Sequence, residues 1–113
     1  MKISLFFKDG EEYWSTVDGG IVHKGNKEYR NKAGLLHRDC DFPAVEYANG
    51  TKEWWKKGVR HRDYNMPAIR YFNGDCEFWV NGKRHREYGP AVVYGNKLYW
   101  FINGEFIKEE ENV

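Results

Sequence analysis

The chain has 113 residues and a net charge of +1, from 18 Lys and Arg against 17 Asp and Glu. This length allows one domain, and the balanced charge argues against a strongly basic nucleic-acid wrapper and against an acidic DNA mimic. Leu, Ile, Val and Phe make up only 24 residues, a share that borders on disorder, yet Phe, Trp and Tyr account for 18% of the chain. We therefore expect a core built largely from aromatic rings.

The N-terminal third predicts two irregular repeat units, 1–20 and 21–34, with a turn at Asp9-Gly10 in the first. The apolar run between Lys2 and Lys8 is too short for a signal peptide, and no run approaches the length of a membrane span. With no secretion signal, we expect a cytoplasmic protein whose two cysteines, Cys40 and Cys76, are reduced.

From residue 35 onward the chain repeats itself every 24 residues. The triplets His37-Arg38-Asp39, His61-Arg62-Asp63 and His85-Arg86-Glu87 are each followed by Pro-Ala, a short strand-like run, a glycine turn and two adjacent aromatic residues. These repeats define regular units at 35–58, 59–82 and 83–104, followed by a tail at 105–113 that contains Lys108-Glu109-Glu110-Glu111 and is expected to be solvated and frayed. A period in this range is typical of a stacked array.

Each unit has the turn chemistry of β-hairpins. Asn-Gly pairs at 49–50, 73–74, 81–82 and 103–104 favour type I′ turns, which need positive φ at both positions. Alternation after Pro67 places Ile69 and Tyr71 on one face and Ala68 and Arg70 on the other. No window has helical periodicity, so we expect an all-β fold, an array of consecutive antiparallel β-hairpins forming an elongated, twisted meander sheet.

Residues 78–94, with Trp79, Asn81-Gly82, His85 and then Gly89-Pro90-Ala91, resemble the MORN repeat. The resemblance extends over 35–104 and more weakly over 9–34. Arginine follows each histidine where MORN repeats usually have glycine, a variant similar to MORN-like repeats of bacteriophages, giant viruses and some bacteria. The resemblance implies a scaffold or protein-binding module, with membrane-lipid binding also proposed for such arrays, rather than an enzyme.

The sequence gives little support for a metal site or a catalytic site. Equivalent histidines lie two strands apart, about 10 Å, which is too far for His37, His61 and His85 to share a zinc ion. We expect each of them to close its own turn by hydrogen bonding. His61-Arg62-Asp63 matches a kinase triplet only superficially, since the other kinase motifs are missing and the triplet recurs as part of the repeat. We expect no enzyme activity, no catalytic residues, no metal and no cofactor.

A basic stripe is an alternative source of function. Arg60, Arg62, Arg84 and Arg86, interleaved with tryptophans, have the composition of a surface for single-stranded nucleic acid or for anionic lipid. The acidic residue after Arg38, Arg62 and Arg86 favours local neutralisation by salt bridges within the turn.

The paired aromatic residues form two columns on opposite faces, because adjacent strand residues point in opposite directions. Trp54, Phe78 and Trp100 make one column, and Trp55, Trp79 and Phe101 make the other. One column is expected in the core. The other is either covered by sheet twist and by Lys and Arg stems or exposed as a stripe that anchors a protein partner.

The sequence therefore predicts a non-enzymatic protein-binding repeat module. The virus-like style of the repeats suggests a phage- or virus-encoded inhibitor of a host protein, such as a defence or CRISPR component, acting in the host cytoplasm. Nucleic-acid or lipid binding is the alternative, and the open ends of the array allow a homodimer or self-assembly. The candidate partner-binding residues are Trp54, Trp55, Phe78, Trp79, Trp100, Phe101, Arg60, Arg62, Arg84 and Arg86.

Overall fold

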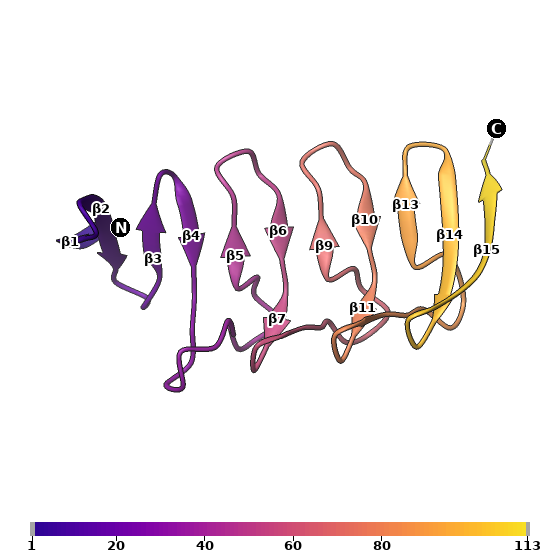
Figure 1. The fold of residues 1–113 in the computed structure, drawn as a ribbon, viewed down its shortest axis with the longest axis horizontal. Helices are drawn as coiled ribbons and strands as arrows, with labels where there is room; N and C mark the ends of the chain where they lie inside the picture. The colour runs from indigo at the N-terminus through magenta and orange to yellow at the C-terminus, as the bar shows by residue number, and fades with distance from the viewer. Residues whose placement is uncertain (1, 113) are drawn as a thin grey trace.

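The computed structural model describes residues 2–112, which form an all-β array of consecutive antiparallel hairpins and contain no helix (Figure 1). The expected fold class is confirmed. Met1, the start of the first expected unit, and Val113, the end of the expected tail, lie outside the described residues. The strands are β1 (Lys2–Lys8), β2 (Glu11–Thr16), β3 (Ile21–His23), β4 (Asn26–Glu28), β5 (Val45–Glu46), β6 (Lys52–Glu53), β7 (Trp55–Lys56), β8 (Val59–Arg60), β9 (Ile69–Arg70), β10 (Cys76–Glu77), β11 (Trp79–Val80), β12 (Lys83–Arg84), β13 (Val92–Tyr94), β14 (Lys97–Ile102) and β15 (Glu105–Glu111).

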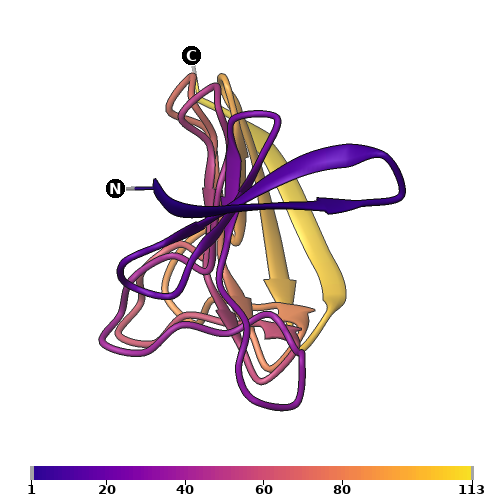
Figure 2. The same ribbon diagram turned by 90° about the vertical axis from the view of Figure 1, so that its left-hand side faces the viewer.

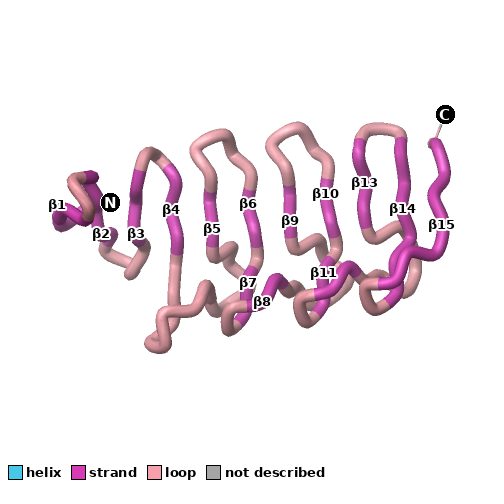
Figure 3. The backbone as a smooth tube through the Cα atoms, viewed as in Figure 1, coloured by secondary structure: helices cyan, strands magenta, loops and turns pink. Residues whose placement is uncertain are grey.

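Most of these strands belong to one long open sheet with the order β1-β2-β3-β4-β5-β6-β9-β10-β13-β14-β15. The short pairs β7-β8 and β11-β12 form a second row of hairpins along its lower edge, and β14 spans the height of both rows (Figure 3). The array measures 47 × 28 × 25 Å. Viewed from the N-terminal end, the repeats nearly superpose, whereas β1 and β2 lie across the other strands (Figure 2).

The two rows use different turns. In the lower row both central residues have positive φ, with Asn81 at 52° and Gly82 at 80°, so these are the expected type I′ turns. In the upper row the expectation is wrong: at Asn49-Gly50 only the glycine has positive φ. There the Asn49 Oδ1 accepts the Thr51 N–H at 2.9 Å and the Gly50 N–H donates to the Tyr47 carbonyl at 2.9 Å. The asparagine braces a longer loop instead of adopting the left-handed conformation.

The core lies where the two rows meet. The alanine after each proline has no exposed surface (Ala44, Ala68 and Ala91), and the next residue, Val45, Ile69 or Val92, is nearly as buried. Tyr29, Trp54 and Phe78 supply the buried rings, but the other six buried hydrophobic residues of the described chain are Ala, Val or Ile, so the expectation of a core built largely from rings holds only in part. The backbone connects these layers, since the Trp54 N–H donates to the Ala68 carbonyl at 2.7 Å and the Phe78 N–H donates to the Ala91 carbonyl at 2.7 Å.

The C-terminal segment differs from the expectation. Glu105–Glu111 is exposed along its length but does not fray, because the turn at Asn103-Gly104 reverses the chain and β15 pairs with β14. The Phe106 ring packs against Phe101 at 5.7 Å, and Lys108 lies 4.5 Å from the Trp100 ring centroid. In the described part of the chain there is no helix long and apolar enough to cross a membrane.

Candidate functional site

Each His-Arg-acid triplet places its arginine flat over a buried ring. The Cζ atom lies 3.7 to 3.9 Å from the ring centroid in the pairs Arg38–Tyr29, Arg62–Trp54 and Arg86–Phe78. The same guanidinium donates to a carbonyl of its own repeat, at 3.1 Å from Arg62 Nη1 to the Pro67 oxygen. The Arg62 side chain is buried, so its stacking and hydrogen bonds take the place of hydration.

In the first two triplets the acidic residue pairs with the histidine, not with the arginine. Nε2 of His61 lies 2.7 Å from Asp63 Oδ1, while Arg62 Nε donates at 3.0 Å to Asp41 of the preceding repeat. The prediction that the next residue neutralises each arginine is therefore wrong. The Arg62 guanidinium stacks on Trp54 and so points toward the preceding repeat, where Asp41 accepts its hydrogen bond.

The histidines connect the two rows of the array. In each case Nδ1 accepts a backbone N–H from the turn of the lower hairpin, from Lys57 to His37, from Asn81 to His61 and from Asn103 to His85, at 2.9 to 3.0 Å. Since Nδ1 is the acceptor, the ring proton of His61 lies on Nε2, which donates it to Asp63. Within residues 2–112 no group of three or more His, Cys, Asp or Glu is placed to hold a metal ion.

The aromatic columns have different surroundings. Trp54 and Phe78 are only 6% and 7% exposed and form the core column. Trp55, Trp79 and Phe101 are half-buried, with Arg60 between the first two rings, 4.8 and 5.0 Å from their centroids, and Arg84 at 5.4 Å from both Trp79 and Phe101. We call this second column the ring–arginine ladder. The ladder rings are partly covered by arginine stems, the first of the two alternatives left open by the sequence.

A buried carboxylate organises the ladder. Glu77 is 2% exposed and accepts hydrogen bonds from the Tyr71 hydroxyl at 2.6 Å, from Trp79 Nε1 at 3.0 Å, from Arg84 Nε at 3.0 Å and from the Tyr94 hydroxyl. Burial alone would raise the pKa of Glu77, but these four donors outweigh it and lower the pKa below its usual range. Glu53 has the equivalent place one repeat earlier, with donors on Tyr47, Trp55 and Arg60.

The tyrosines around these carboxylates predict an alkaline limit to stability. Burial and the hydrogen bond to Glu77 raise the pKa of Tyr71 well above its ordinary value of 10.0. Above pH 10 the unfolded chain loses this proton while the folded chain keeps it, so the free energy of unfolding falls by ~1.4 kcal/mol per pH unit for such a tyrosine. Urea titrations between pH 9 and 11 measure this slope. Tyr71→Phe should make it shallower, and an unchanged slope in this variant would contradict the assignment.

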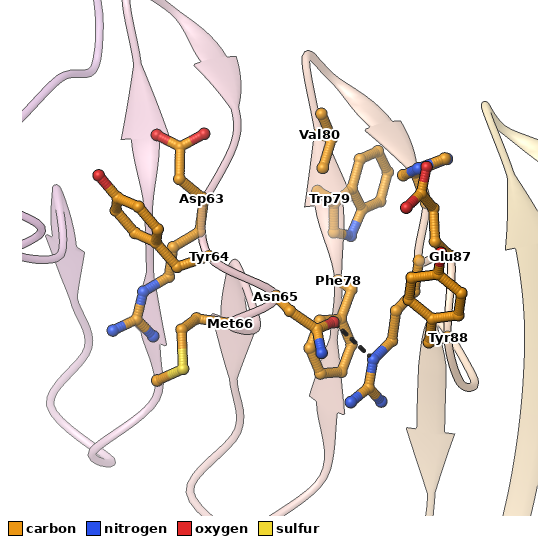
Figure 4. Close-up of a pocket in the computed structure, with 12 residues that line it drawn as sticks. Asp63, Tyr64, Asn65, Met66, Phe78, Trp79, Val80, Glu87 and Tyr88 are labelled. Carbon is orange, nitrogen blue, oxygen red and sulfur yellow. Dashed lines mark hydrogen bonds between the residues drawn. The ribbon is translucent and has the colours of Figure 1, made fainter.

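Two equivalent cavities open between successive His-Arg-acid loops, and we call them the loop grooves. One, of about 390 Å³, lies between residues 62–66 and 85–88, and its lining includes Phe78 and Trp79 (Figure 4). The other, of about 340 Å³, lies between residues 37–41 and 61–64, with Trp54 and Trp55 in the equivalent positions. The residues that line the larger groove lie about 24 positions after the residues that line the smaller one. The groove is therefore a property of the repeat.

Exposed tyrosines form the walls of the loop grooves. Tyr64 and Tyr88 are 87% and 85% exposed, and Asp63 and Glu87 lie beside them on the rim (Figure 4). Tyr64 has a φ of 63°, in the left-handed region that a bulky residue rarely adopts. Arg62, Asp63 and Tyr64 belong to both grooves and form the wall between them. Sequence reasoning missed both tyrosines, although each stands two residues after its arginine in successive repeats.

The predicted binding residues divide between two places. Trp54, Trp55, Phe78, Trp79, Arg62 and Arg86 line the loop grooves. Arg60, Arg84 and Phe101 belong to the ladder and not to a groove lining, and Trp100 lies beneath Lys108. Cys40 lines the smaller groove and is exposed, whereas Cys76 is half-buried in β10, and the two thiols are not bonded.

Known proteins give no guide to the function of the loop grooves. The chain matches no family model, no curated protein and no solved structure.

Proposed function

We propose that the chain is a non-enzymatic protein-binding repeat module that holds a segment of a partner protein in the loop grooves. The observation that carries this proposal is the recurrence of one aromatic cavity at the spacing of one repeat, with an exposed tyrosine on its wall. Exposed tyrosines beside apolar hollows are typical anchors of protein interfaces. Cys40, at the equivalent position one repeat earlier, has the same φ of 63° as Tyr64, so the loop conformation that presents this side chain to solvent recurs in the array.

The spacing of the grooves fits an extended polypeptide. Equivalent strands of neighbouring repeats are two strands apart, about 10 Å, and three residues of extended chain span about the same distance. A bound segment is therefore expected to place one side chain in each groove, three residues apart, in a polyproline II conformation, whose three residues per turn direct such side chains to the same face. The exposed carboxylates of Asp63 and Glu87 favour a segment that carries basic residues beside these anchors.

A viral role for this module rests on the resemblance of residues 35–104 to virus-like MORN repeats. On that basis the partner is a host protein, such as a defence or CRISPR component, which the module blocks by occupying its surface.

Nucleic-acid or anionic-lipid binding has less support, since the arginines of the basic stripe already have partners. Arg60 and Arg84 pair with Glu53 and Glu77, and Arg62 is buried against Trp54. The salt dependence of the affinity distinguishes a nucleic-acid partner from a protein partner. The affinity for nucleic acid falls steeply between 50 and 200 mM salt, whereas the affinity of a tyrosine-anchored protein interface changes little.

Replacing both groove tyrosines tests the proposed function. The double variant Tyr64→Asn with Tyr88→Asn is expected to weaken partner binding at least 30-fold, the effect of losing hot-spot side chains of about 2 kcal/mol or more. Stability should not fall, because asparagine tolerates the left-handed backbone at residue 64 better than tyrosine. The partner is recovered by affinity capture from the host lysate, and its binding to each variant is then titrated by calorimetry.

The matched control is Phe72→Asn, which removes an exposed ring from the upper turn between β9 and β10, away from both grooves. This control should bind as the parent protein does. Equal binding by the double groove variant and by the parent protein would overturn the proposal.

A further inference from the structure

The main sheet ends in two open edges at opposite ends of the array (Figure 1). Among the described residues β1 pairs only with β2, and β15 pairs only with β14, so each of these outer strands has one side without a neighbour. Such an edge offers unpaired backbone N–H and C=O groups to another strand. The two edges cannot meet within one molecule, because the length of the array, 47 Å, separates them.

The two edge strands are matched in length and opposite in charge. Each has seven residues; β1 reads KISLFFK, with two lysines and no acid, and β15 reads EFIKEEE, with four glutamates and one lysine. An antiparallel alignment of the full strands sets Lys8 against Glu105, Phe7 against Phe106 and Phe6 against Ile107. All of these side chains are exposed, and neither Lys8 nor Glu105 has an ion pair within residues 2–112.

The alternative of like edges is unfavourable. Pairing β15 with a second β15 in the same antiparallel manner sets Glu105 against Glu111 at both ends, and like charges directly opposite each other destabilise a sheet. The β15 edge is therefore complementary to β1 and not to itself.

We propose that copies of this chain associate head to tail, with β1 of one copy pairing with β15 of the next and continuing the sheet across the junction. An interface of this kind joins two different surfaces, so it adds further copies, into an open chain or a ring, instead of stopping at a two-fold dimer. The proposal is independent of the loop grooves, which lie away from both edges.

Sedimentation velocity and light scattering over a range of protein concentrations test this assembly. The weight-average mass of the parent protein should rise with concentration without levelling off at two copies, and the rise should weaken at high salt. Lys8→Glu and Glu105→Lys should each weaken association about fivefold or more, because each opposes like charges at the junction. Lys32→Glu, which makes the same charge change in the exposed 31–35 loop, should associate as the parent protein does.

Mixing the two edge variants gives the decisive result. A 1:1 mixture of Lys8→Glu and Glu105→Lys restores opposite charges at every junction between unlike copies, so its mass should return toward that of the parent protein. Circular dichroism verifies that each variant is folded. A parent protein that remains monomeric, a mass that levels off at two copies, or a mixture that stays as dissociated as its components would each overturn the proposal.

Discussion

Replacing Glu77 by alanine is expected to lower the free energy of unfolding by about 2–4 kcal/mol, because it leaves partly buried hydrogen-bond donors without their acceptor. The substitution leaves the Arg84 guanidinium without its carboxylate and removes the acceptor of three further donors, on Tyr71, Trp79 and Tyr94. Tyr71 and Trp79 are half-buried and do not regain full hydration, whereas Arg84, whose side chain is 37% exposed, keeps part of its own. Urea denaturation measured by tryptophan fluorescence gives the free energy.

Two other glutamates provide the matched comparison. Glu53→Ala should cost less than Glu77→Ala, since the Glu53 side chain is more exposed and its arginine is more distant, at 3.3 Å against 3.0 Å. Glu87→Ala, on the exposed rim of a loop groove, should change stability by less than about 0.5 kcal/mol. A loss below about 1 kcal/mol in Glu77→Ala would show that the carboxylate does not organise the ring–arginine ladder.

Local chemistry explains why the architecture was predictable from sequence. The positive φ angles at Asn81 and Gly82 are determined by these two residues and their immediate neighbours. The proline before each upper strand likewise acts only on the residues next to it. Because the same sequence pattern recurs, each repeat forms the same unit and the units stack into an array. The same reasoning failed at Asn49-Gly50, because that dipeptide is compatible with a longer loop in which the side chain of Asn49 bonds to Thr51.

Contacts between repeats could not be predicted from the sequence, because they depend on residues far apart in the chain. The sequence places Asp63 beside Arg62, but the arginine pairs with Asp41, 21 residues earlier, since stacking on Trp54 fixes its direction. The sequence also gives no sign that Glu77 is buried. Its two neighbouring strands set Ile69 and Val92 against it, and that register exists only in the folded sheet.

The candidate site was predicted in part for the same reason. The adjacent aromatic residues were identified as binding candidates, and the structure places Trp54, Trp55, Phe78 and Trp79 at the grooves. Tyr64 and Tyr88 were missed because an aromatic residue in a repeat is equally compatible with the core. Their exposure depends on loop geometry, including the left-handed backbone of Tyr64, and not on residue type.

Trp54→Ala is expected to cost about 3–5 kcal/mol, the range for truncating a large buried ring, because the buried aliphatic residues of the core are mostly Ala and Val and have little volume to fill the space. Its indole also donates to the Asp41 carbonyl at 2.9 Å and supports the guanidinium of Arg62 at 3.8 Å. Trp100→Ala, at the half-buried equivalent position near the end of the array, should cost less than half as much.

A double-mutant cycle between Trp54 and Arg62 separates the stacking from the burial. Arg62→Lys should cost about 1.5–3 kcal/mol although the charge is kept, because an ammonium cannot stack on the ring and bond both Asp41 and the Pro67 carbonyl as a planar guanidinium does. Combined with Trp54→Ala, the two losses should fall short of additivity by about 1 kcal/mol, the worth of a desolvated cation–π pair. Thermal and urea denaturation of the parent and the three variants measure the cycle. Strict additivity would mean that Arg62 is held by its hydrogen bonds alone and that the rings of the core column stabilise the array only by their burial.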